Sequence, residues 1–190
     1  YPDLDGIQGD DRFPAMPRNS GYDTYTVSLY QSQHQGNNPP VDYNNSEWVH
    51  WRLDILNTFA KRLYKRIKAK SPNVMISFAP NPYPWCKEKV CDLLAVQCYR
   101  YSVDAYRATV SEVLKYIHQN NPNQLFAPGM ILMEGSNSKM SPELLQKQLR
   151  INRELGINSE IYFYNKGIDN PSVRKVLKQT YYQKIKFPEN

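Results

Sequence analysis

Five short apolar stretches, separated by longer segments with helical periodicity, constrain the fold of this chain more than any other feature. The stretches cover residues 4–9, 73–80, 92–99, 124–133 and 160–164. Apolar runs of this length, bounded by Pro, Gly and Asn, predict buried β-strands. Strands that alternate with helices and are apolar on both faces are typical of a parallel sheet covered by helices. The sequence therefore predicts the α/β class.

Four helices are expected between and after these strands, and three of them have a recognisable start or end. Ser46 is expected to cap the first, and Pro72 stops it. Ser141 with Pro142, and Asn170 with Pro171, have the residue types that begin helices. The predicted helices cover residues 46–70, 103–119, 142–156 and 171–184.

Two connections depart from the usual lengths. Residues 12–45 carry many prolines and glycines and form a predicted loop far longer than most connections. We expect either a functional flap, with Tyr22, Tyr25 or Tyr30 as stacking surfaces for a ligand, or a solvated insertion. By contrast, only residues 81–91 separate two strands of the predicted parallel sheet, where a crossover helix is usual. Either that helix has degenerated or residues are absent.

The charge of the chain does not by itself indicate a nucleic-acid partner. The formal net charge is +6, and much of the excess lies within residues 61–70 and 174–186, in predicted helices. Cations in these places suit the helix macrodipole and a solvated face. No phosphate loop or nucleic-acid motif accompanies them, and no apolar run approaches the roughly 20 residues that span a bilayer. We therefore expect no nucleic-acid partner and no membrane span.

The three cysteines leave the redox compartment open. Cys86, Cys91 and Cys98 are odd in number and have no repeated spacing, so they are not a disulfide framework. Cys86 and Cys91 could pair across a loop, or all three thiols could be small buried hydrophobes. The three histidines are too scattered for a Cys/His zinc pattern, and the sequence predicts no metal site and no cofactor.

Asp10 and Asp11 are the strongest candidates for catalytic groups. They follow the first apolar stretch, where a strand is expected to open into a loop. Neighbouring strand residues point to opposite faces, so one carboxylate would face a substrate while the other positions it. The alternative is an Asx turn, since Asp often closes turns through its own backbone.

Other polar and aromatic residues follow the carboxyl ends of the remaining predicted strands. Because these ends meet at one edge of a parallel sheet, we expect them to line a cleft with Arg12. Single aromatic residues are as often core residues. The candidate binding residues are Arg12, Asn81, Tyr83, Trp85, Gln97, Tyr99, Arg100, Tyr164 and Asn165, and Glu134 is the candidate second carboxylate.

Four motifs resemble the glycoside-hydrolase-like family GHL10, also described as DUF187 or YngK-like. They are Asp5-Gly6-Ile7-Gln8-Gly9-Asp10-Asp11, Trp48-x-x-Trp51-Arg52, Ile76-Ser77-Phe78-Ala79-Pro80 and Asp92-Leu93-Leu94-Ala95-Val96-Gln97-Cys98-Tyr99. The resemblance implies a carbohydrate-active enzyme of bacterial origin, often exported, with a (β/α)8 barrel. The five strands would be strands four to eight of that barrel.

The leading hypothesis is a glycoside hydrolase that acts on an oligo- or polysaccharide by carboxylate catalysis through Asp10, Asp11 and Glu134. The alternative is a catalytically inert glycan-binding or scaffold module with the same aromatic residues. We expect residues 1–190 to be part of a longer chain, because they do not begin with Met. The missing barrel half would then come from the same chain or from a partner.

Overall fold

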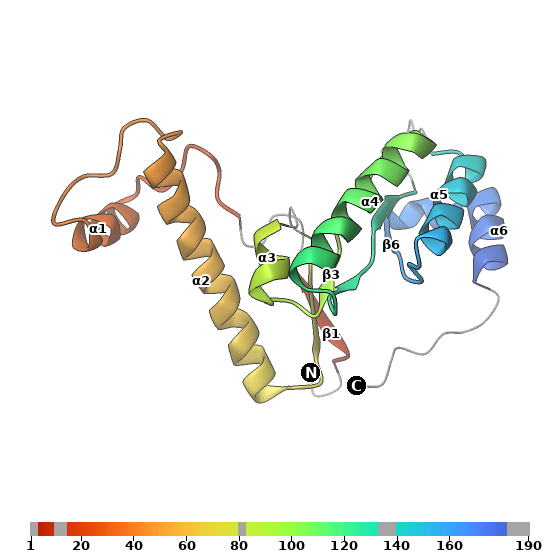
Figure 1. Ribbon diagram of the computed structural model, residues 1–190, viewed down its shortest axis with the longest axis horizontal. Coiled ribbons are helices and arrows are strands. Elements are labelled where there is room, and N and C mark those ends of the chain that lie inside the picture. Colours follow the sequence, from red (N-terminus) through yellow and green to blue (C-terminus); the bar gives the residue numbers. More distant parts are fainter. Residues whose placement is uncertain (1–3, 10–14, 80–82, 133–139, 182–190) are drawn as a thin grey trace. The chain divides into compact units, whose positions relative to one another are not determined.

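The computed structural model describes residues 4–9, 15–79, 83–132 and 140–181, without the side chains of residues 83–85. By its internal contacts the chain divides into two compact units. Unit 1 comprises Tyr1–Asp11 with Asn73–Asn190, and unit 2 comprises Arg12–Pro72. Unit 1 holds the strands, whereas unit 2 is helical (Figure 1).

The strands of unit 1 pair in parallel and in chain order. The first sheet contains β1 (Gly6–Gly9), β2 (Met75–Phe78), β3 (Leu93–Leu94) and β4 (Leu125–Phe126), and a second pairs β5 (Gly129–Ile131) with β6 (Ile161–Phe163). The backbone joins them, because the N–H of Gly129 donates to Val96 O at 2.7 Å and the N–H of Cys98 donates to Gly129 O at 2.9 Å. Pro128, which has no N–H, lies where β4 and β5 separate. All five predicted strands are present, and the α/β prediction is confirmed.

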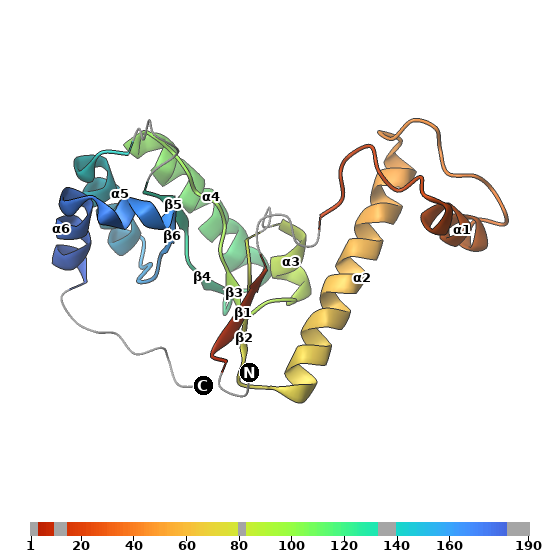
Figure 2. The ribbon, with the colours of Figure 1, turned by 180° about the vertical axis from the view of Figure 1, so that it is seen from behind.

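The helices of unit 1 pack beside these strands. They are α3 (Tyr83–Glu88), α4 (Val103–Asn120), α5 (Pro142–Glu154) and α6 (Pro171–Thr180), with a 3-10 helix η1 (Asn165–Asp169) after β6. Helix α5 lies between α4 and α6 (Figures 1 and 2). Ser141 caps α5 as predicted, accepting from the N–H of Leu144 at 3.1 Å. The last helix ends at Thr180, earlier than predicted, and α3 is the short helix that makes the connection between β2 and β3 possible.

Unit 2 consists of α1 (Thr24–Gln33) and α2 (Ser46–Lys70) with their connections. The α2 prediction is confirmed in its bounds, but its cap is Asn45 rather than Ser46, since Asn45 Oδ1 accepts from the N–H of Trp48 at 3.2 Å. The prediction of an uninterrupted loop over residues 12–45 is wrong, because α1 lies within it.

Trp48 and Arg52 anchor the connections of unit 2 to α2. Arg52 is 6% exposed, and its guanidinium donates to the carbonyls of Arg18 and Ser20, both at 2.8 Å, and of Tyr43 at 3.0 Å. Its guanidinium also lies 5.0 Å from the ring centroid of the fully buried Trp48. Two residues of the Trp48-x-x-Trp51-Arg52 motif therefore have a structural role.

Of the three tyrosines expected in the loop, only one is widely exposed. The ring of Tyr30 is buried against Trp48 and Trp51, and Tyr22 donates its hydroxyl to Pro40 O at 2.8 Å. Tyr25 is 77% exposed. A sugar-stacking role for this segment stays a prediction, and Tyr30 is the least suited to it.

All three cysteines are buried free thiols, so the pairing of Cys86 with Cys91 is wrong. Burial raises the pKa of Cys91 and of Cys98 to about 12. The thiols therefore act as small core hydrophobes, which is the second of the two alternatives.

Candidate functional site

Five of the predicted binding residues have side chains that the structure describes, and they lie at or beyond the carboxyl ends of the strands. Gln97, Tyr99 and Arg100 follow β3, whereas Tyr164 and Asn165 follow β6. These two segments are neighbours because β5, which pairs with β6, also meets Gln97 at Gly129. Ligands bind at this end of the strands in parallel α/β enzymes.

Two aromatic rings from the two segments stack on each other. The ring centroids of Tyr99 and Phe163 are 5.7 Å apart and the ring planes differ by 24°. The Tyr164 ring lies 5.7 Å from Phe163 at 59°. Phe163 is 50% exposed and Tyr164 is 42% exposed, so part of this surface is open to solvent. We name Tyr99, Phe163 and Tyr164 the aromatic rim.

Two glycines allow close approach of the backbone segments near the aromatic rim. A Cβ on Gly129 would lie 3.0 Å from Val96 O and 3.5 Å from Cε1 of Tyr99. A Cβ on Gly167, in η1, would collide with the Cβ of Leu132. Gly129 therefore lets β5 approach the backbone of Val96, and Gly167 lets η1 pack against Leu132, the residue after β5.

Polar groups flank the aromatic rim. The side chains of Gln97, Arg100 and Asn165 are exposed. Arg100 Nη1 donates to the backbone carbonyl of Tyr99 at 2.8 Å, so its guanidinium is held at the backbone of a rim residue. Exposed amide and guanidinium groups beside aromatic faces suit a ligand that has both hydroxyl groups and apolar faces.

The remaining candidates lie outside the described residues. These are the three carboxylates Asp10, Asp11 and Glu134, with Arg12 and Asn81. The side chains of Tyr83 and Trp85 also lie outside the description, although the backbone of both belongs to α3. The carboxylate pair therefore stays a prediction.

Sequence reasoning missed Phe163, which contributes the most exposed ring of the aromatic rim. The strand register brings Phe163 to this place. Phe163 pairs with Ile131, two residues after Gly129, and Gly129 forms a bridge with Gln97. A register cannot be derived from apolar periodicity alone, because several alignments satisfy the same pattern.

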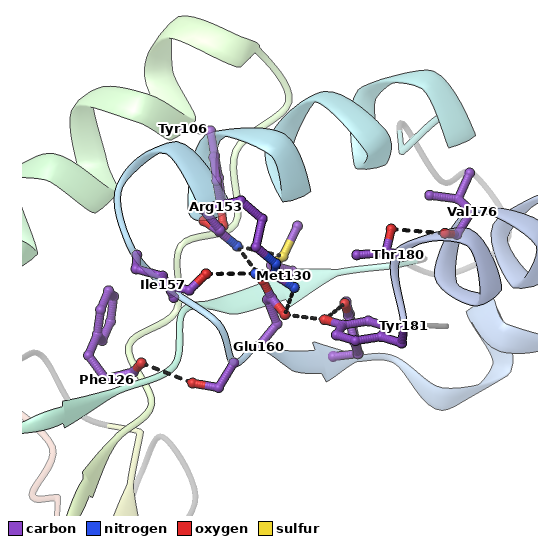
Figure 3. Close-up of polar contacts among 12 residues, drawn as sticks. Tyr106, Phe126, Met130, Arg153, Ile157, Glu160, Val176, Thr180 and Tyr181 are labelled. Carbon is purple, nitrogen blue, oxygen red and sulfur yellow. Dashed lines mark hydrogen bonds and ion pairs between the residues drawn. The ribbon is translucent and has the colours of Figure 1, made fainter. Parts of the chain in front are cut away.

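A second polar cluster, also not predicted, lies around Glu160 at the amino end of β6 (Figure 3). The Glu160 side chain has no exposed surface and forms an ion pair with Arg153. It also accepts from Asn152 Nδ2 at 3.0 Å and from the hydroxyl of Tyr181. The hydroxyl of Tyr106 donates to Asn152 Oδ1 at 2.9 Å. We name these five residues the Glu160 cluster.

The Glu160 cluster has the properties of a structural group. Burial, followed by the hydrogen bond to Glu160, raises the pKa of Tyr181 to about 12. The bond to Glu160 also raises the pKa of Arg153 further above its usual value. The cluster joins α4, α5 and the residue after α6 to the start of β6, the end of the strands at which residues usually serve stability.

Neither metal ligation nor membrane insertion is indicated by the described residues. They contain no group of three His, Cys, Asp or Glu side chains placed to hold a metal ion. None of the helices that the structure describes is long and apolar enough to cross a membrane.

The fold is similar to those of two glycoside hydrolases. The glycoside hydrolase domain of PgaB (BpsB) from Bordetella bronchiseptica aligns with a TM-score of 0.68 and 12% identity, over 95% of this chain and 57% of that one. Bee venom hyaluronidase aligns with a TM-score of 0.57 and 15% identity, over 95% of this chain and 70% of that one. The chain therefore spans little more than half of the PgaB domain. At these identities the likeness concerns the fold alone.

Sequence comparison gives the family. No curated protein matches the chain. The family described as Glycosyl hydrolase-like 10 matches residues 1–143. Since this match covers most of the sequence and agrees with the fold, the chain belongs to the glycosyl hydrolase-like family GHL10.

Proposed function

We propose that the protein is a glycoside hydrolase that acts on a polysaccharide and binds it over the aromatic rim. The observation that carries this proposal is the stack of the exposed Phe163 on Tyr99 at the carboxyl ends of the strands, in a chain of the GHL10 family. A pyranose ring has an apolar C–H face that packs on an aromatic ring, and its hydroxyl groups bind amides and guanidinium groups. Gln97, Arg100 and Asn165 supply such groups beside the rim.

The proposed chemistry uses two carboxyl groups. One protonates the leaving oxygen and the other acts as nucleophile or base, at roughly 5 to 5.5 Å in retaining enzymes and 6.5 to 9.5 Å in inverting enzymes. Asp10 or Asp11, which follow β1 in the sequence, would supply one group, and Glu134, which follows β5, would supply the other.

A catalytically inert glycan-binding module is the second candidate. One observation favours it: the rim segments 97–100 and 163–165 contain no Asp or Glu. Binding would then need only the aromatic rim and its polar neighbours. The two candidates differ in whether glycosidic bonds are cleaved.

The test uses the full-length protein with a glycan panel of hyaluronan, chitin, cellulose, pectin and dextran. The panel includes acidic, N-acetylated and neutral chains, and hyaluronan is included because one structural neighbour is a hyaluronidase. We expect the protein to bind at least one member and to release new reducing ends from it. Binding without release would favour the inert module, and the absence of both would contradict the two candidates together.

Replacement of Phe163 by alanine should weaken glycan binding about fivefold to tenfold, because one exposed stacking surface of about 1 kcal/mol is lost. Equilibrium binding to the panel member that the parent protein binds measures this change. Phe59→Ala is the matched control, since Phe59 is 45% exposed but lies in α2. If the two substitutions have equal effects, the aromatic rim is not part of the binding site.

We also propose that the strands of unit 1 are the second part of a (β/α)8 barrel. Among the described strands, β1 pairs only with β2 and β6 only with β5, whereas β4 is followed at once by β5, which meets the segment after β3 at Gly129. A pocket of about 370 Å³ lies along β1, β2 and β3, with Gln8, Ser77, Ala127 and Ile161 among its lining residues. In a closed barrel, side chains of the remaining strands would fill such a space.

The barrel proposal predicts that residues 1–190 associate or aggregate when they are isolated, because open edges of a parallel sheet pair with other chains. Sedimentation and urea unfolding of this piece, beside the full-length protein, measure the difference. A stable monomer of residues 1–190 that unfolds cooperatively would contradict the proposal.

A further inference from the structure

Gln148 places a polar side chain in the buried face of α5. It is 1% exposed and lies in the same helix face as Leu145 and Leu149, which are also buried. A buried amide is costly unless it is hydrogen-bonded. Its Nε2 donates to the backbone carbonyl of Arg100 at 2.8 Å, across 48 residues of sequence. The amide therefore donates a hydrogen bond to one particular segment of backbone, the segment that carries Tyr99.

That segment lies where the chain leaves the sheet. The N–H of Cys98 donates to Gly129 O at 2.9 Å, and α4 begins at Val103 after its cap Ser102. Between them, Tyr99 stacks on Phe163, and Arg100 donates back to Tyr99 O at 2.8 Å. The hydrogen bond from Gln148 reaches the middle of this turn from the buried face of α5, so it fixes the backbone on which the Tyr99 ring depends.

We propose that Gln148 is a positioning residue for the aromatic rim. It holds the turn at Arg100 so that Tyr99 stays stacked on Phe163 and the two rings form one prearranged face for a sugar. The part of this proposal that concerns sugar binding rests on the proposed function. Prearrangement matters because ordering an aromatic ring on binding costs entropy, and this cost lowers the affinity for the sugar.

Gln148→Met tests the proposal, because methionine keeps the length and approximate volume of the side chain and removes the donor. In the full-length protein we expect the nuclear Overhauser effects between the Tyr99 and Phe163 rings to weaken. We also expect amide hydrogen exchange over residues 99–102 to become about tenfold faster, because this turn opens locally. Affinity for the glycan-panel member that the parent binds should fall about tenfold. Gln148→Leu is the second variant and should give the same result.

Two controls separate positioning from general stability. Gln146→Met makes the same substitution on an exposed site of α5 and should leave all three measurements unchanged. Leu149→Ala removes a buried side chain from the same helix and should lower the melting temperature. Well below that temperature, it should keep the contact between the Tyr99 and Phe163 rings and the glycan affinity.

Each outcome bears on one of the two proposals. Ring contacts of parental strength in both Gln148 variants would overturn the positioning role, whatever the glycan binding. Weakened ring contacts with unchanged glycan affinity would overturn the role of the prearranged rim in sugar binding. If the ring contacts weaken but the parent binds no member of the panel, the proposed function fails while the positioning of Tyr99 by Gln148 stands.

Discussion

Replacement of one of Asp10 and Asp11 by asparagine is expected to lower turnover by about a thousandfold or more, and replacement of the other to lower it less. Asparagine keeps the size of the side chain and removes the charge that would meet the positive charge developing at the anomeric carbon. The effects should be unequal because neighbouring residues at a strand end face apart. One carboxylate would participate directly, and the other would be a positioning group bonded to backbone or to Arg12 or Arg100.

Reducing-end release by the full-length protein measures these two variants, with the melting temperature as a check that the fold is kept. Asp5→Asn is the matched control, since Asp5 precedes β1 and so lies at the opposite end of that strand. Its turnover should be that of the parent protein. If both Asp10→Asn and Asp11→Asn cleave the substrate at the parental rate, the catalytic assignment is wrong and the inert glycan-binding module replaces it.

Arg153→Met is expected to lower the free energy of unfolding by about 3 kcal/mol, because it leaves the carboxylate of Glu160 buried without its cation. The Glu160 side chain has no exposed surface, and Arg153 is the cation that pairs with it among the described residues. The bond from Arg153 Nη1 to Ile157 O, at 2.7 Å, is lost as well. Urea unfolding of the full-length protein, followed by circular dichroism, measures the change.

A second ion pair of the same helix provides the control. Arg107 of α4 pairs with Glu154 of α5 at 2.5 Å, but both side chains are nearly half exposed. Arg107→Met should therefore cost less than about 1 kcal/mol. If both variants lose the same small amount of stability, the Glu160 cluster does not hold α5 and the residue after α6 to the start of β6.

The strands and most helix starts were predictable because their signals are local. Each strand is an apolar run, and the pair Ser141 and Pro142 predicts the start of α5 from two neighbouring residues. Helix α1 has a weaker signal: Asp23 caps it, but most of its residues are polar or β-branched, and Tyr30 is the residue that it buries. That helix depends on the packing of Tyr30 against Trp48 and Trp51 of α2, so tertiary contacts override its weak propensity.

The candidate site was predicted in its position more than in its parts. Polar and aromatic residues after parallel strands must gather at one edge, which is why Gln97, Tyr99 and Arg100 could be named from the sequence. The partners of these residues could not be named from the sequence. Phe163 stacks on Tyr99 through the strand register, and Gln148 reaches Arg100 through the packing of α5, and neither relation is visible in a single sequence.

The Glu160 cluster also limits where this chain can be truncated while unit 1 stays folded. The family match ends at residue 143, just inside α5, whereas β5 pairs with β6 and the carboxylate of Glu160 is covered by Tyr181. A truncation at the end of the match would remove the partner strand of β5 and uncover the fully buried side chain of Met130. The family match thus ends at residue 143, whereas the contacts that hold unit 1 together extend to Tyr181. Truncations meant to keep unit 1 folded have to retain Tyr181.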